Sequence, residues 1–438
     1  MLASARPFLT LAALLSLAAC TGAEAPDGGA PAGDGAKAGK AKAKAEAPAY
    51  VPLQQAIEGA PAPAILLSQA WFLKDANGKP KPGPARLQVW RKGADGWQAT
   101  LLEDGESNVF HKALATDAGL LTIAGEKAML KRWSHTAGAW SAETLWSKSW
   151  GGKFNRLRDI EVGDVDADGK DEWVVATHDG GVIAVINPGE NGAAPEVIEL
   201  DAKPDTFVHE IEIGDIDGDG KKEFFATPSD RNQANASQAG EIVAYRWDGT
   251  TYTRSLVDGG AETHAKEVLA TDLNGDGKAE LFGVLEAETD AAKQVKTPVR
   301  IRQYTPQPDG TFAHTDIATI NDRQTRFLVA GDFDGDGQTE LVAAAMKTGL
   351  YLLDPSTDAK GVTTWASTVI DPVSSGFEHA TIAADVDGDG RPELIVAADD
   401  QRELKLYRWD AEKKAFAKEL IGRLQGDTIT WNIAFTTL

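Results

Sequence analysis

The chain has 438 residues, a formal net charge of −22 and a single cysteine. So acidic a chain argues against nucleic-acid binding, and much of the negative charge falls in a few short, regularly spaced segments. One cysteine excludes any disulfide within the chain.

The first twenty residues predict an export signal. Arg6 precedes an apolar run from Leu9 to Leu17, which is too short to span a membrane. The run ends in Leu17-Ala-Ala-Cys20, which resembles the lipobox of bacterial lipoproteins. That resemblance implies lipidation at Cys20, attachment to the membrane of a bacterial cell envelope and, with Thr21 next, retention at the outer membrane, on a side left open. A plain signal peptide that happens to contain a cysteine is the alternative.

Residues 21–50 are rich in Ala, Gly, Pro and Lys and contain almost no large apolar side chain. Such a segment cannot bury a core, so we expect a flexible tether. Its lysines are either solvated or in contact with anionic lipid or cell-wall polymers.

Residues 51–438 contain an internal repeat. A nine-residue phrase, with polar oxygen-bearing residues at positions 1, 3 and 5, glycine at 6 and glutamate at 9, occurs five times. Repetition at this spacing is typical of a repeat protein. The predicted metal site residues, with position 7 acting through its backbone carbonyl, are Asp164, Asp166, Asp168, Lys170 and Glu172; Asp215, Asp217, Asp219, Lys221 and Glu223; Asp272, Asn274, Asp276, Lys278 and Glu280; Asp332, Asp334, Asp336, Gln338 and Glu340; and Asp385, Asp387, Asp389, Arg391 and Glu393.

The phrase predicts about five Ca²⁺ sites. Calcium accepts 6–8 oxygen ligands in flexible geometry, and glycine permits the sharp turn that gathers them. The absence of His and Cys from the phrases disfavours zinc and copper. An EF-hand is excluded because it needs a glutamate at position 12 and flanking helices, whereas the flanks here alternate like strands. Asn274 carries no charge, so we expect its loop to bind calcium more weakly. Acidic turns without a metal are the alternative.

Strand-like segments repeat with the loops. Each loop is followed by short alternating runs bounded by Gly, Asp and Pro, which predict four-stranded units. Two more units precede the first loop, and the first of them lacks an inner strand that Trp431–Phe435 supplies from the other end of the chain. The predicted fold class is all-β, a seven-bladed β-propeller closed by the C-terminal strand. Six or eight blades stay possible because the first two units have no metal loop.

The repeats resemble FG-GAP or VCBS repeats, the calcium-loop blades of integrin α-chain heads and many bacterial surface proteins. The segment from Arg326 to Gly337 is close to the family pattern. The resemblance covers residues 155–400 strongly and 60–150 weakly. It implies calcium sites and an extracytoplasmic setting, without implying integrin function.

A second recurrence lies six residues before each loop or its equivalent. His111, Arg158, His209, Lys266, Arg326 and His379 stand there, Trp431 occupies the closing strand, and His178 lies beside His209. These residues predict a basic and aromatic ring at one mouth of the propeller, near the long loops Lys74–Ala85, Pro228–Ala239 and Glu286–Pro298. The ring is either an anion or acidic-sugar site, a transition-metal site, or a set of cations that satisfy neighbouring acids such as Asp159, Glu210 and Glu267.

Three functions follow from these features. The first is a non-enzymatic surface binding or adhesion module for a glycan or protein. The second is a carbohydrate-active enzyme of the polysaccharide lyase kind, although the sequence contains no recognisable catalytic signature and no catalytic residue is assigned. The third is an envelope assembly scaffold. The identity of the ligand stays open.

Overall fold

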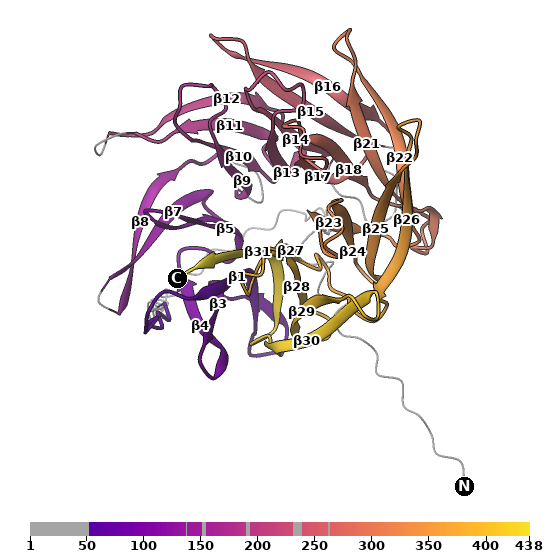
Figure 1. The fold of residues 1–438 in the computed structure, drawn as a ribbon. Helices are drawn as coiled ribbons and strands as arrows, with labels where there is room; N and C mark the ends of the chain where they lie inside the picture. The colour runs from indigo at the N-terminus through magenta and orange to yellow at the C-terminus, as the bar shows by residue number, and fades with distance from the viewer. Residues whose placement is uncertain (1–51, 137, 151–154, 190–192, 231–238, 262) are drawn as a thin grey trace, which may run out of the picture.

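The computed structural model describes residues 52–136, 138–150, 155–189, 193–230, 239–261 and 263–438. Cys20, the export signal and the tether lie outside these residues. Seven antiparallel sheets are arranged in a ring (Figure 1). This arrangement confirms the predicted all-β class and the seven-bladed propeller. Within the described ranges, no helix is long and apolar enough to cross a membrane.

Each blade has four strands, numbered here from the axis of the ring outward. The innermost strands of blades 1 to 7 are β31 (Thr428–Thr437), β5 (Phe110–Thr116), β9 (Leu157–Gly163), β13 (Thr206–Gly214), β17 (Ala265–Thr271), β23 (Thr325–Gly331) and β27 (Thr381–Ala384). The second strands are β1 (Pro63–Lys74), β6 (Gly119–Ala124), β10 (Glu172–Thr177), β14 (Glu223–Asp230), β18 (Glu280–Leu285), β24 (Glu340–Ala345) and β28 (Glu393–Ala398).

The outer half of each blade is a hairpin. The third strands are β3 (Ala85–Gly93), β7 (Met129–Thr136), β11 (Val182–Asn187), β15 (Gly240–Trp247), β21 (Val299–Pro306), β25 (Gly349–Thr357) and β29 (Glu403–Asp410). The outermost strands are β4 (Gly96–Asp104), β8 (Ala139–Ser147), β12 (Glu196–Ala202), β16 (Tyr252–Gly260), β22 (Phe312–Ile320), β26 (Thr363–Asp371) and β30 (Ala415–Arg423).

The closing strand is the one predicted from the sequence. β31 pairs antiparallel with β1, with Ile65 opposite Phe435 and Leu67 opposite Ile433. The two ends of the described chain therefore share one sheet, which leaves no open edge between blades 1 and 7.

Among the described residues, seven hydrophobic clusters lie one between each pair of neighbouring blades, and an eighth, smaller cluster contains Ala70, Val109, Ile429 and Trp431. Between blades 3 and 4, for example, Val174 and Val185 pack against Val208, Phe224 and Tyr245. Each blade buries both faces against its neighbours, which explains why second strands such as β24 and β28 are almost wholly apolar after their first glutamate.

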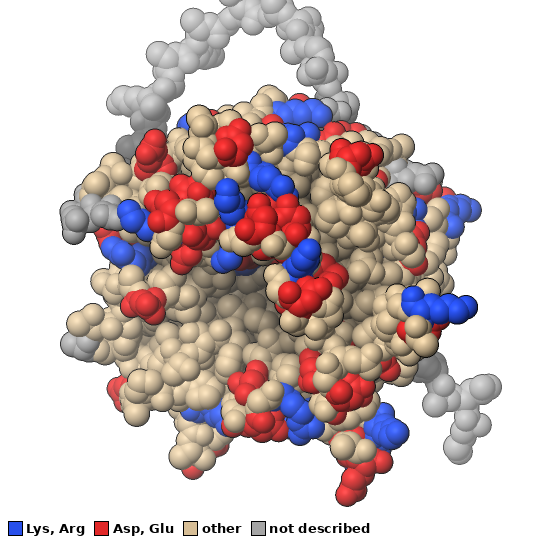
Figure 2. All heavy atoms as spheres, turned by 45° about the horizontal axis from the view of Figure 1, so that its top comes forward, with Lys and Arg blue, Asp and Glu red and all other residues tan. Residues whose placement is uncertain are grey.

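Two of the three long loops predicted near one mouth contain small hairpins. β2 (Pro80–Pro82) pairs with the end of β1, and β19 (Glu288–Thr289) pairs with β20 (Val295–Thr297). The loop from Pro228 to Ala239 lies largely outside the described residues. Figure 2 shows one face of the disc, hollowed at the centre of the ring, with acidic and basic residues gathered around the rim.

Candidate functional site

The five acidic phrases form the turns between the first and second strands of blades 3 to 7. One pattern of hydrogen bonds recurs in all five: the position-1 Asp accepts the amide of the position-6 glycine, as Asp215 Oδ2 does from Gly220 at 2.8 Å. That glycine has a positive φ in every loop, for example +83° in Gly220 and +90° in Gly390. The sequence argument for glycine at this position therefore holds.

The position-7 residue is fixed by its backbone. The amide of Lys221 donates to Asp219 Oδ1 at 2.9 Å, and the other four loops repeat the bond. The position-9 glutamate begins the second strand and accepts the amide of position 2, as Glu340 Oε2 does from Phe333 at 2.9 Å. These bonds hold the loop in shape and use one oxygen of the position-9 glutamate, whose second oxygen can take another partner, whereas both oxygens of the position-1 aspartate accept amides within the loop.

Four of the loops gather carboxylates closely enough to hold a metal ion. In each group the oxygens lie within 4.8 Å of one another. The groups are Asp164, Asp166 and Glu172; Asp215, Asp217 and Glu223; Asp332, Asp334, Asp336 and Glu340; and Asp385, Asp387 and Glu393. In the loop of blade 5, Asn274 Nδ2 donates instead to Glu280 Oε1 at 2.9 Å, so this loop gathers fewer charges.

The buried position-9 glutamates show whether the acidic loops suit a cation. Glu172 Oε1 is buried and has no hydrogen-bond partner within the described chain. Burial, followed by the neighbouring aspartates, raises the pKa of Glu172 to about 7, and burial is likewise the main reason why the pKa values of Glu223 and Glu340 rise to about 7. A hard divalent cation would supply the missing partner and offset the repulsion, so the residues fit Ca²⁺.

The residues of the second recurrence lie at the other end of the inner strands, in a group that we call the basic layer. Its members are His111, Arg158, His178, His209, Lys266, Arg326 and Trp431, all at most 7% exposed. The sequence predicted that these residues form a ring at one mouth of the propeller. In the structure their side chains are buried within the ring of blades and pack against one another. His111 contacts the Trp431 ring at a centroid distance of 4.9 Å, and His178 contacts His209 at 5.7 Å.

Acidic residues that the sequence reasoning missed tie this layer together. Glu378 lies between blades, 3.7 Å from Arg158 Nη2 and in an ion pair with Arg326. Arg326 also contacts Glu286 at 3.1 Å. Lys266 and Arg326 lower the pKa of Glu286 to about 2, although burial alone would raise it. Two features of the sequence could have pointed to these acids. Glu286 begins a long loop between second and third strands, and Glu378 directly precedes His379, which belongs to the second recurrence.

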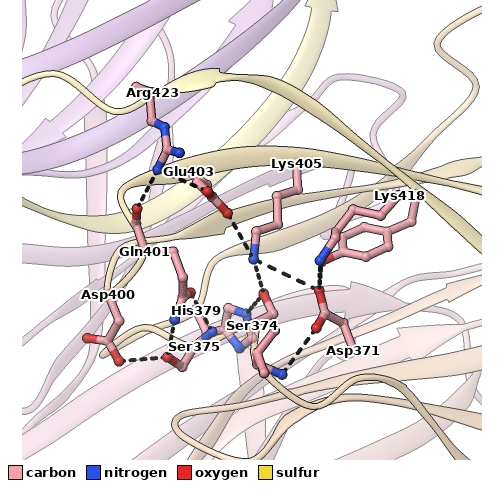
Figure 3. Close-up of polar contacts among 12 residues, drawn as sticks. Asp371, Ser374, Ser375, His379, Asp400, Gln401, Glu403, Lys405, Lys418 and Arg423 are labelled. Carbon is pink, nitrogen blue, oxygen red and sulfur yellow. Dashed lines mark hydrogen bonds and ion pairs between the residues drawn. The ribbon is translucent and has the colours of Figure 1, made fainter. Parts of the chain in front are cut away.

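His379 is held apart from the basic layer. Its Nδ1 lies 2.7 Å from the carbonyl oxygen of Ala345, so Nδ1 carries the proton, and Nε2 accepts the Ser374 hydroxyl at 2.8 Å. Ser374 also accepts a hydrogen bond from Lys405, and Figure 3 shows these residues as one network with Asp371. Both ring nitrogens of His379 are thus occupied within blades 6 and 7.

The acids next to the basic layer have other partners. Lys112 Nζ lies 3.0 Å from Asp159 and 4.0 Å from Glu210. Asp159 accepts the amide of Ile211 in the next blade at 2.7 Å, and Glu267 accepts that of Leu328 at 3.0 Å. These carboxylates thus bond to the backbone of the neighbouring blade or contact Lys112, so they have partners other than the recurrent cations.

Several polar atoms of the basic layer have no hydrogen-bond partner in the part of the chain that is described. They are both ring nitrogens of His111 and of His209, Arg158 Nε and Trp431 Nε1. Burial, together with Arg156 and Arg158 nearby, lowers the pKa values of His111 and His178 well below their ordinary range, and burial with Lys266 and Arg158 does so for His209. The imidazoles are therefore neutral, and each offers one donor and one acceptor.

Comparison with known proteins supports the repeat and the fold. The sequence model of the FG-GAP-like repeat matches residues 164–226. The chain is 28% identical over 255 residues to the rhamnogalacturonan exolyase YesX of Bacillus subtilis (strain 168), a match that covers 48% of this chain and 40% of that protein. The chain thus spans less than half the length of this curated relative.

Solved structures show similarity in fold alone. The periplasmic gluconolactonase of Pseudomonas aeruginosa matches with a TM-score of 0.53 at 13% identity, over 85% of this chain and 99% of that one. A putative 6-phosphogluconolactonase of Bacteroides uniformis matches with a TM-score of 0.50 at 14% identity, over 86% and 99% of the two chains.

Proposed function

Because the chain is a seven-bladed β-propeller in which residues 164–226 match the FG-GAP-like repeat, we propose that it is a calcium-stabilised binding module for a carboxylate-bearing glycan. The observation that carries the proposal is the pair of buried, unpartnered imidazoles of His111 and His209 beside Arg158. Buried polar atoms rarely lack a partner, and leaving one unpaired costs about 1–3 kcal/mol. A ligand oxygen would supply that partner.

The chemistry of the basic layer favours an anion. Arg156, Arg158, Lys266 and Arg326 lie among the histidines. Glu286 and Glu378 pair with Arg326 or Arg158, and Asp179 contacts His178. Guanidinium groups bind carboxylates through charge-assisted hydrogen bonds. Neutral imidazoles suit sugar hydroxyls because they donate and accept, and Trp431 Nε1 adds a donor that has no partner in the described part of the chain. A uronate-containing saccharide has both the carboxylate and the hydroxyls that these groups would bind.

The cellular setting is part of the same proposal. Lipidation at Cys20 and the tether of residues 21–50 would hold the propeller at the outer membrane of a bacterial envelope, where millimolar calcium suits loops of this kind. The protein would then act as a displayed adhesion module.

The test measures equilibrium binding of the full chain to polygalacturonate oligomers and to neutral glucans of matched length. We expect binding to the acidic oligomers alone and a loss of about tenfold or more in Arg158→Gln, since a hydrogen bond to a charged group contributes about 1.5–3 kcal/mol. Arg132→Gln is the matched control because Arg132 pairs with Glu143 on the exposed outer hairpin of blade 2. Equal binding of neutral glucans, or no binding to any glycan, contradicts the proposal; the latter leaves a protein partner and the scaffold function.

The second candidate is a polysaccharide lyase, favoured by the 28% identity to a rhamnogalacturonan exolyase. In this reaction a neutral His209 takes the proton next to the uronate carboxylate, the glycosidic C–O bond on the following carbon breaks as a C=C bond forms, and the leaving sugar oxygen gains a proton. Arg158 and Lys266 would stabilise the charge on the carboxylate. The accumulation of an ultraviolet-absorbing unsaturated uronate identifies the lyase. Binding without that product identifies the module.

A further inference from the structure

One residue on the third strand of each loop-bearing blade faces the glutamate that ends the metal loop. The register defines it: Phe224 pairs with Tyr245, so Arg246 lies opposite Glu223. In the same way Leu394 pairs with Tyr407, which places Arg408 opposite Glu393. Across blades 3 to 7 the residues at this position are Asn187, Arg246, Thr305, Asp354 and Arg408. We call it the facing position.

The two arginines reach the same two ligands in their own loops. Arg246 Nη2 lies 2.8 Å from Glu223 Oε1 and forms a second ion pair with Asp217. Arg408 Nε lies 3.1 Å from Glu393 Oε1 and 3.4 Å from Asp387 Oδ2. In both blades the guanidinium thus engages the carboxylates at positions 3 and 9, which are among the oxygens that a cation would need.

Blade 6 carries the opposite charge at the facing position. Burial, and then Asp334 and Asp336, raise the pKa of Asp354, which places this carboxylate within the field of its own loop. Of the acidic groups in the described part of the chain, the blade 6 loop alone brings four acids together. Positions 1 to 9 of this loop contain no basic residue, and Asp354 adds a further negative charge beside them.

We propose that the facing position sets the order in which the loops take up calcium, a proposal that rests on calcium occupying the loops. The loop of blade 6, with Asp354, binds most tightly. The loops of blades 4 and 7 bind weakly, because Arg246 and Arg408 hold two ligand carboxylates and repel the cation. Ligand charge is a main determinant of calcium affinity. One unit charge about 5 Å from a divalent ion changes the binding constant by about tenfold even in water.

The consequence is a propeller whose calcium sites differ in affinity. At low calcium the blade 6 loop is filled first, and the blade 4 and blade 7 loops are filled only as calcium rises. Those two blades lie on opposite sides of blades 5 and 6 in the ring (Figure 1). Calcium therefore stiffens the ring in steps as its concentration rises.

The test is a calcium-binding isotherm of the full chain, measured by competition with a chromophoric chelator. Arg246→Gln and Arg408→Gln should each tighten one weak site by about tenfold, and Asp354→Asn should weaken the tightest site by about tenfold. Arg246→Lys keeps the charge and should stay near the wild-type value. Arg254→Gln is the control in the same blade, since Arg254 pairs with Asp201 and Glu241 rather than with the loop.

Unchanged or weaker calcium binding in both Arg→Gln variants overturns the proposal, because the arginines would then orient the ligands rather than compete for them. A tightest site that Asp354→Asn leaves unaltered overturns it as well. If the wild type and every variant bind no calcium, calcium occupancy itself fails, which is a separate result. Far-ultraviolet circular dichroism of each variant confirms that the fold is intact before its isotherm is interpreted.

Discussion

Thr430 of the closing strand is bonded twice to Asp399 of blade 7. The Thr430 amide donates to Asp399 Oδ2 at 2.7 Å, and its hydroxyl donates to Asp399 Oδ1 at 2.8 Å. Asp159 and Glu267 accept amides of the following blade in a comparable way. The bonds of Asp399 differ from those of Asp159 and Glu267 because they join blade 7 to β31, the strand that closes the ring.

Removal of this junction should destabilise the whole propeller. Asp399→Ala loses two hydrogen bonds and leaves a partly buried amide without a partner, which we expect to cost about 1–3 kcal/mol in the free energy of unfolding. Denaturant unfolding of the variant measures the loss. Glu412→Ala, in an exposed turn of the same blade, serves as the control and should change stability by less than about 0.5 kcal/mol. A loss no larger than that of the control would show that closure depends on β1–β31 pairing alone.

The same carboxyl should make stability depend on pH. Burial raises the pKa of Asp399 to about 7, although the Thr430 donors lower it. Since the folded-state pKa lies above the unfolded value of about 4, the folded state retains the proton between these values. The contribution of Asp399 is greatest at the acid end and is lost as pH rises to about 7. Because the side chain is only partly buried, we expect a swing of about 1–2 kcal/mol.

Asp399→Asn isolates this effect. An amide can still accept the Thr430 N–H and donate to its hydroxyl, but it does not titrate in this range. The difference in unfolding free energy between the wild type and Asp399→Asn should fall as pH rises from about 4 to about 7. A difference that stays constant over that interval contradicts the assignment.

The architecture was predictable because its signals are local and repeated. Each loop from Asp to Glu carries its turn chemistry within nine residues, and the spacing of copies gives the blade. Even the closure was visible, because Trp431–Phe435 has the alternation of an inner strand without a unit of its own.

The basic layer was harder to predict. Its members were found through a fixed offset from the loops, but an offset does not show how side chains pack across the axis of the ring. Glu378 meets Arg158 from a non-adjacent blade, and no sequence period encodes such a contact. His379 stands at the same offset from its loop as His209, yet its two ring nitrogens are bonded to Ser374 and Ala345. The offset therefore predicted location better than role.

Calcium should stabilise the folded protein. A ligand that binds only the native state adds RT ln(1 + [L]/Kd), or about 1.4 kcal/mol for each site at ten times its Kd. With several sites we expect the melting temperature to rise by several degrees in millimolar calcium and to return in excess chelator. Asp332→Asn in the blade 6 loop should reduce the rise. Asp309→Asn, in an exposed hairpin turn, should not. Identical melting curves in calcium and in chelator would contradict calcium binding by the loops.

Binding of an acidic glycan at the basic layer should be nearly independent of pH around neutrality. Burial and the nearby cations lower the pKa values of His111, His178 and His209 well below 6.5, so these rings are neutral and do not change charge there. The anion-binding charge comes from arginine and lysine, which stay protonated. We therefore expect a constant Kd for galacturonate oligomers between about pH 6 and pH 8, where their carboxylates are fully ionised. An affinity that falls as pH rises through about 6.5 would mean that a charged histidine holds the ligand, and His209→Gln would then abolish that dependence.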